Sequence, residues 1–177
     1  DDNCDGNIDD GCPLIPSKIA DVRSFPHYVA LSAKYAAVSL KSTKRLAIFD
    51  RTKRPPALLR EAALAEEPHG VQIDGDTAYV VSAKTLFKVN LLDGKSEAFV
   101  TFASGDHAGD LVVQNGRAFT RRAASNNTEL SFCLTDLTTK QTSCLALQEQ
   151  VIKIGAGVLL VGASGLVLSN KGIHIFE

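Results

Sequence analysis

The chain has 177 residues, a formal net charge of −1, and neither Met nor Trp. This length fits one domain with a real hydrophobic core, and the near-neutral charge provides no global field for nucleic acid or a membrane surface. Hydrophobic residues make up 45% of the sequence. Because no run of 18 apolar residues occurs, the sequence predicts no transmembrane segment.

The first twelve residues alternate side-chain oxygens with other residue types. Asp1, Asn3 and Asp5 are followed by a glycine and then by the acidic pair Asp9 and Asp10. A hard cation prefers six to eight oxygen ligands, and alternating positions on a tightly turned loop converge on one point. The spacing therefore predicts a calcium-binding loop at 1–12, with another hard cation or a plain acidic turn as the alternatives.

This loop resembles the metal-binding repeat of bacterial surface proteins (the MopE type), and it is similar to thrombospondin type-3 and dockerin calcium loops. The resemblance implies a bacterial protein that is secreted or lies at the cell surface, with calcium as its cofactor. Cys12 stands where an EF-hand has its bidentate Glu, which lowers the expected affinity. The implied ligands, one of them a backbone carbonyl at position 7, are Asp1, Asn3, Asp5, Asn7, Asp9 and Asp10.

After the loop, the sequence repeats weakly with a period of about forty residues. The segment 25–31 resembles 67–73, and a turn and a short apolar strand follow each, at 35–40 and 77–82. A further strand in each unit ends in a polar residue. These strand ends are Asp50, Asn90, Asp136 and Glu177.

Turn signals within the units are those of β-hairpins. Asp74-Gly75 and Asn115-Gly116 separate apolar runs, as type I′ turns require, and Asp93-Gly94 separates another pair. The segment 56–66 favours a helix by propensity, but the register of the repeat predicts an outer strand and a loop there. Units of forty residues with four strands each are typical of β-propeller blades.

We therefore predict an all-β fold in which β-propeller-like repeats at 13–177 follow the calcium loop. The strand set resembles propeller repeats of the NHL and LVIVD kinds, with 68–81 as the most similar stretch. The units form a closed four-bladed propeller, in which 17–24 completes the last blade, or part of a larger propeller; an irregular β-sandwich is the third alternative. The approximate units are 25–66, 67–104, 105–147 and 148–177.

The four cysteines form two local pairs. Cys133 and Cys144 flank a predicted hairpin with its turn at 137–140, so they are expected to lie opposite each other and form a disulfide. Cys4 and Cys12 flank the calcium loop and could form a second disulfide, unless Cys4 pairs with a cysteine outside this sequence. The even count favours an oxidising compartment.

Three histidines stand near the starts of predicted innermost strands. His27 and His69 occupy the same place in two repeats, each after a proline, and His107 is two positions out of register with them. Such positions tend to face the axial channel, where imidazoles could bind a metal or an anion. The alternative is that each histidine hydrogen-bonds a loop between blades.

Basic residues gather between positions 34 and 60, where Asp50 is the single acid. This surface could attract an acidic partner, but it lacks the interleaved aromatic residues that nucleic-acid stacking requires. The alternative is a solvated face without a partner. The predicted patch is Lys41, Lys44, Arg45, Arg51, Lys53 and Arg54.

The sequence contains no nucleophile elbow, P-loop, dinucleotide fingerprint or HExxH motif. We therefore expect a secreted or cell-surface, calcium-binding and non-catalytic interaction module, whose partner is a protein or an acidic polysaccharide. One alternative is a metal-dependent lyase or hydrolase with a histidine-lined axial channel. The other is a structural subunit of an extracellular assembly, joined to other chains or to the rest of a larger propeller.

Overall fold

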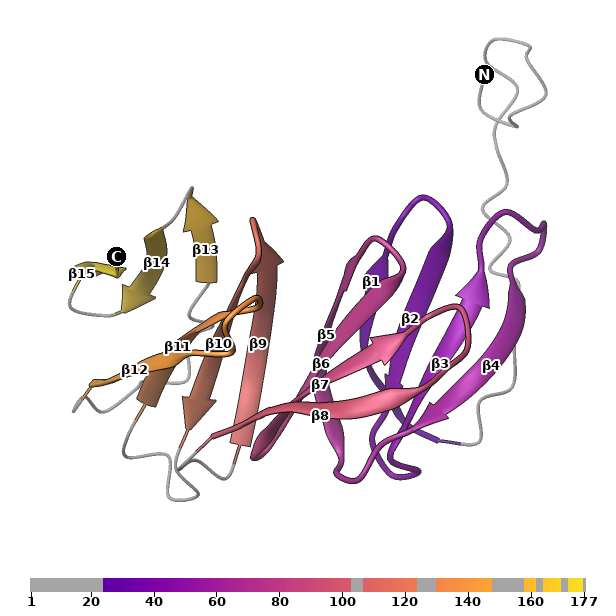
Figure 1. The fold of residues 1–177 in the computed structure, drawn as a ribbon, viewed down its shortest axis with the longest axis horizontal. Helices are drawn as coiled ribbons and strands as arrows, with labels where there is room; N and C mark the ends of the chain where they lie inside the picture. Colours follow the sequence, from indigo (N-terminus) through magenta and orange to yellow (C-terminus); the bar gives the residue numbers. More distant parts are fainter. Residues whose placement is uncertain are drawn as a thin grey trace, which may run out of the picture.

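A computed structural model describes residues 24–102, 107–123, 130–147, 158–161, 164–169 and 172–176. These residues form fifteen strands in four antiparallel sheets, joined by turns and short loops (Figure 1). The described ranges contain no helix, and hence none that is long and apolar enough to cross a bilayer. The prediction of an all-β fold is confirmed.

Strand order within each sheet follows the chain. The first sheet contains β1 (Pro26–Leu31), β2 (Tyr35–Leu40), β3 (Arg45–Asp50) and β4 (Ala57–Ala63). The second contains β5 (Pro68–Asp74), β6 (Thr77–Ser82), β7 (Thr85–Asn90) and β8 (Ser96–Thr101). The third contains β9 (His107–Gln114), β10 (Arg117–Ala123), β11 (Leu130–Asp136) and β12 (Thr142–Leu147). The fourth contains β13 (Val158–Val161), β14 (Ser164–Ser169) and β15 (Gly172–Phe176).

The segment that favours a helix by propensity is the outer strand β4, as the repeat register predicts. Its backbone pairs with β3, from Arg45 opposite Ala63 to Asp50 opposite Ala57, with one irregularity in the ladder. Ala62 is buried against the core. Tertiary burial and strand pairing therefore override the local preference of this alanine-rich and leucine-rich stretch.

Two hairpin turns were predicted to be of type I′, and they differ. Asn115 and Gly116 both have positive φ, at 51° and 72°, which confirms that prediction. In the other hairpin, Asp74 pairs with Thr77, so the two turn residues are Gly75 and Asp76. Only Gly75 has positive φ there, at 57°, which fits a type II′ turn and makes the type I′ prediction wrong.

In the first three units, the polar residue that ends the third strand closes the following turn, whereas Glu177 of the fourth unit lies outside the described residues. Oδ1 of Asp50 accepts a hydrogen bond from the Thr52 backbone N–H at 2.8 Å, and Oδ1 of Asn90 accepts one from Leu92 at 2.8 Å. Asp136 repeats this contact with the backbone N–H of Thr138 at 2.9 Å. This shared side-chain-to-backbone bond is the physical reason for the recurrence of Asp and Asn in the repeat.

The core lies between successive sheets. Apolar residues of the first and second sheets form one cluster, which includes Ile48 and Val80, both fully buried. A second cluster joins the second sheet to the third and includes Leu86 and Ala118. The first strands of the sheets contact one another in turn, so β5 packs against β1, β9 against β5, and β13 against β9. The four sheets thus stand side by side along an arc, with the first and fourth at its two ends (Figure 1).

The predicted disulfide between Cys133 and Cys144 is present, and it joins residues that face each other directly in the β11–β12 ladder. Cys133 is buried and Cys144 is exposed. The calcium loop at 1–12, the Cys4–Cys12 pair and, except for Ser24, the segment 17–24 lie outside the described residues.

Candidate functional site

A shallow groove crosses from the first sheet to the second. Its walls come from the β2–β3 turn, from the segment that leads into β5, and from the β6–β7 turn. Three lysines and a histidine meet two carboxylates there, so the groove is lined almost entirely by charged or titratable groups. The lining residues are Lys41, Lys44, Glu66, Glu67, His69, Ala83 and Lys84.

The Glu66 carboxylate accepts three hydrogen bonds within this groove. The hydroxyls of Ser82 and Thr85 donate to its carboxylate at 2.5 Å and 2.7 Å, and the Lys84 backbone N–H donates at 3.1 Å. Burial raises the pKa of Glu66, but the hydrogen bonds lower it by more, so the net pKa lies below its ordinary value. Glu66 is therefore a carboxylate at neutral pH whose hydrogen bonds order the β6–β7 turn.

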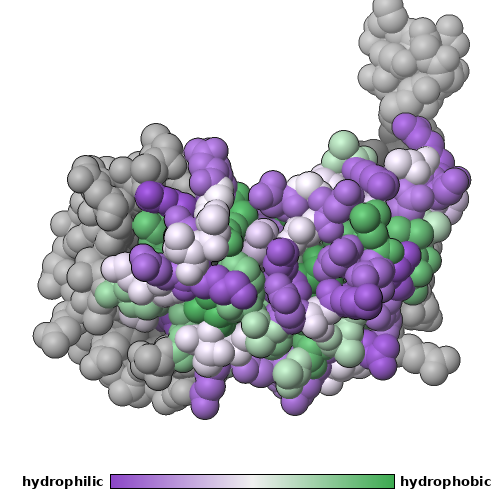
Figure 2. All heavy atoms as spheres, viewed as in Figure 1, coloured by the Kyte–Doolittle hydropathy of each residue, from purple (hydrophilic) through white to green (hydrophobic). Residues whose placement is uncertain are grey.

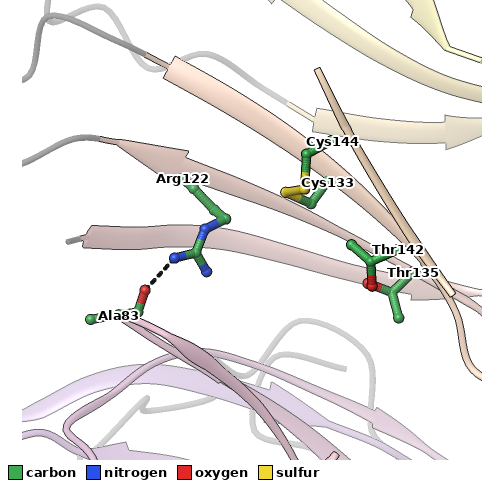
Figure 3. The surroundings of a disulfide bond; sticks show 6 residues. All are labelled: Ala83, Arg122, Cys133, Thr135, Thr142 and Cys144. Atoms are coloured by element: carbon green, nitrogen blue, oxygen red, sulfur yellow. Dashed lines mark hydrogen bonds between the residues drawn. A yellow bond between two sulfur atoms is a disulfide. The ribbon is translucent and has the colours of Figure 1, made fainter. Parts of the chain in front are cut away.

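A buried arginine of the third sheet supports the floor of the groove. Arg122 is 1% exposed, and its guanidinium donates a hydrogen bond to the Ala83 carbonyl oxygen (Figure 3). The guanidinium carbon also lies 4.2 Å from the centre of the Phe102 ring. Because the guanidinium is planar and always charged, this contact fixes the β6–β7 turn relative to the third sheet.

The two histidines that share a repeat position lie together. The ring centres of His27 and His69 are 5.4 Å apart, and His69 is 8% exposed. His27 also lies edge-on to the ring of Tyr28, with ring centres 4.8 Å apart. His107 is the first residue of β9 and pairs with Ala123, which places it two positions before the equivalent of His69, as the sequence predicts.

An electrostatic interaction links the first and third sheets. Burial and the carboxylate of Asp110 raise the pKa of Tyr28, and the Arg121 guanidinium opposes them. Asp110 and Arg121 themselves form an ion pair with Nε and Oδ2 3.4 Å apart. In the strand register, Tyr28, Gly70 and Asp110 occupy equivalent positions in β1, β5 and β9. The glycine of the middle strand therefore places no side chain between the positions of Tyr28 and Asp110.

The structure divides the predicted basic patch into two groups. Lys41, Lys44 and Arg45 lie at one end of β3, whereas the other group follows its far end at 51–54. A six-residue strand separates the groups by on the order of 17 Å. Arg45 pairs with Glu61, with Nη1 and Oε2 3.1 Å apart, so the lysines remain as the available cations of the first group.

Sequence reasoning missed Lys84, Glu66 and Glu67 as members of the site. The signal that could have found Lys84 is its place in the same turn of the second repeat that Lys41 and Lys44 occupy in the first. The proposed calcium ligands lie outside the described residues. Within the described ranges, no group of three His, Cys, Asp or Glu side chains could hold a metal ion.

A scan of protein-family models and a search of curated proteins each found no match. Among solved structures, the chain is similar to hydrazine synthase of Kuenenia stuttgartiensis, with a TM-score of 0.71 and 14% identity over 84% of this chain and 44% of that one. It is similar to the computationally designed protein Ika4, with a TM-score of 0.67 and 11% identity over 90% of this chain and 94% of that one.

The computationally designed protein Ika8 is a third match, with a TM-score of 0.64 and 12% identity over 84% of this chain and 44% of that one. The chain thus spans less than half the length of the hydrazine synthase and Ika8 chains but nearly all of Ika4. Identities this low support a statement about fold alone. The similar solved structures are propeller-like, and this all-β chain shares that architecture with them.

Proposed function

We propose that the protein is a non-catalytic recognition module that binds an acidic polysaccharide in the groove between its first and second sheets. The groove carries the proposal, because three lysines from two different sheets line one surface. Glu66 is held by its own hydrogen bonds within the groove. A row of ammonium groups attracts a polymer with repeated carboxylate or sulfate groups, and the attraction weakens as salt screens it.

Charge reversal at the groove tests this proposal. Replacing Lys41, Lys44 and Lys84 together by Glu is expected to weaken binding of a heparin-like oligosaccharide by about tenfold or more. The reason is that each reversed contact costs on the order of 0.5–1 kcal/mol at an exposed site. Isothermal titration calorimetry at two salt concentrations measures the effect.

The matched control reverses the charges at the other end of β3, by replacing Arg51, Lys53 and Arg54 with Glu. Both variants change the net charge by the same amount within similar exposed turns. The proposal requires the control to bind like the wild type in moderate salt. Equal losses in the two variants would show general charge attraction in place of a defined site.

We also propose that the N-terminal loop binds calcium and that the module works in an oxidising compartment, at the cell surface or outside the cell. The loop offers carboxylate and amide oxygens at alternating positions, which are the donors that calcium prefers. The disulfide between Cys133 and Cys144 is consistent with such a compartment. Calcium bound there would rigidify the segment that precedes the first sheet.

A second candidate function, a metal-dependent enzyme, is favoured by the contact between His27 and His69. Elemental analysis separates the two metal sites. We expect about one calcium per chain, which is lost in the Asp5→Asn, Asp9→Asn double variant and retained in the His27→Ala, His69→Ala double variant. A transition metal that disappears only from the histidine variant would support the enzyme, and a chain without calcium would refute the loop.

A further inference from the structure

The contacts between sheets follow one rule along the whole chain. The first strand of each sheet packs against the first two strands of the sheet before it: β5 against β1 and β2, β9 against β5 and β6, and β13 against β9 and β10. Each sheet therefore has a front face, which meets the preceding sheet, and a back face, which meets the following one.

The front face of the second sheet shows how such an interface is built. Val71, Val80 and Phe87 are directly paired across β5, β6 and β7, and they are 4%, 0% and 3% exposed. Ile73, Ala78 and Val89 form the next paired row. Both rows pack into the cluster shared with the first sheet.

The first sheet repeats this register, although no described sheet precedes it. Val29 pairs with Val38 and Leu31 with Ala36, at the positions that Val71, Val80, Ile73 and Ala78 occupy in the second sheet. Val29 and Leu31 are each 61% exposed, in contrast to the 4% of Val71. Apolar residues reach the surface over the first sheet (Figure 2).

The open part of this front face is a strip along the inner edge of the sheet. Val38 and Ala36 are half-buried beside the exposed Val29 and Leu31, whereas Ala47 and Phe49, farther out on β3, are buried already. The strip matches the contact rule, because the first strand of a sheet makes the main contact with its predecessor. The strip thus has the register of one half of such an interface, and none of the described sheets covers it.

The fourth sheet supplies the matching half at the other end of the arc. Its register places Leu166 opposite Leu159 and Ile175, and Leu168 opposite Ile173. Leu166 and Leu168 occupy the positions that Tyr79 and Val81 hold on the back face of the second sheet, which packs against the third. The back-face positions of the fourth sheet are therefore apolar in sequence, and no described sheet follows them.

We propose that the front strip of the first sheet docks on the back face of the fourth sheet of a second copy. By the contact rule, β1 of one copy packs against β13 and β14 of the other. The first and fourth sheets of one chain lie at opposite ends of the arc, so they do not meet each other (Figure 1). Such a head-to-tail interface closes when two copies meet twice, giving one ring with four sheets from each copy.

The fraction of each similar structure that this chain aligns with is consistent with such a ring. The same chain aligns with 94% of Ika4 but with 44% of Ika8 and 44% of the hydrazine synthase chain. An arc of four sheets thus corresponds to about half of two propeller-like chains.

The mass in solution tests the proposal. Size-exclusion chromatography with light scattering, between about 1 and 200 µM chain, is expected to give twice the 18.9 kDa of one chain at the upper concentrations. The Val29→Asp, Leu31→Asp double variant is expected to be monomeric throughout. Leu92→Asp, which changes an exposed leucine outside the strip, is expected to remain dimeric. A monomeric wild type, or a dimer that the double variant leaves intact, would overturn the proposal.

A variant at the other half distinguishes head-to-tail from face-to-face pairing. Leu168→Thr keeps a strand-forming residue, and it is expected to weaken the dimer at least tenfold. If the dimer depends on Val29 and Leu31 but is unchanged by Leu168→Thr, two front faces meet and the head-to-tail arrangement is wrong. Circular dichroism confirms that each variant keeps its sheets, and the wild-type mass decides the matter even where a variant does not fold.

Discussion

Replacing Phe119 by alanine is expected to lower the free energy of unfolding by about 3–5 kcal/mol, a large part of the stability of an ordinary domain. Phe119 is 1% exposed and lies on β10, next to Ala118 of the cluster that faces the second sheet. Because neighbouring residues of a strand alternate between faces, Phe119 lies on the back face of the third sheet. Its ring stacks on Phe132, with ring centres 5.8 Å apart.

Phe119 lies on the face of the third sheet that meets the fourth sheet, since β13 packs against β9 and β10. The alanine variant therefore measures how tightly this back face is packed, and urea unfolding followed by circular dichroism gives the value. Phe25→Ala is the matched control: Phe25 is 81% exposed, and its loss is expected to cost less than about 0.5 kcal/mol. Similar small losses in both variants would contradict the packed arrangement of the third and fourth sheets.

The second large effect is expected at the disulfide. Replacing Cys144 by serine opens the bond to Cys133 and is expected to lower the free energy of unfolding by about 2–4 kcal/mol, chiefly because the unfolded chain regains freedom. Cys144 is exposed, so the serine hydroxyl remains solvated and the core is undisturbed. Thermal and urea unfolding of the variant beside the wild type measure the change.

Ser143→Ala serves as the control for the disulfide variant, because Ser143 is the exposed neighbour of Cys144 on the same strand. Its expected cost is below about 0.5 kcal/mol. If Cys144→Ser were equally harmless, the β11–β12 hairpin would be held by its ladder and by contacts such as the one between the Thr135 and Thr142 hydroxyls, 2.9 Å apart.

Local sequence signals were sufficient for most of the strands. Apolar alternation and turn residues predicted strands at 35–40 and 77–82 and a strand end at Asp50, and all three match the observed strands. The pairing of Cys133 with Cys144 followed from the short turn between them, since a short hairpin fixes its register. Repetition of the unit corrected the helix propensity of 56–66, where single-segment propensity alone would have failed.

The features that the sequence did not predict depend on strand register and on how neighbouring sheets pack together. The run of basic residues was expected to form one patch. The strand β3 separates its two groups, so side chains at the two ends of this strand cannot share a site. Lys84 joins Lys41 and Lys44 only after the first and second sheets pack together. The type II′ turn depended on the register of one pair, Asp74 and Thr77, which composition does not determine.

Hydrogen exchange measured by mass spectrometry, with and without an acidic oligosaccharide, tests most directly whether the groove is the recognition site. We expect slower exchange at 41–44, 66–69 and 83–84, the three segments that line the groove, and unchanged exchange in the basic turn at 51–54. Protection of 51–54 alone, or of no segment at saturating oligosaccharide, would contradict the proposed site.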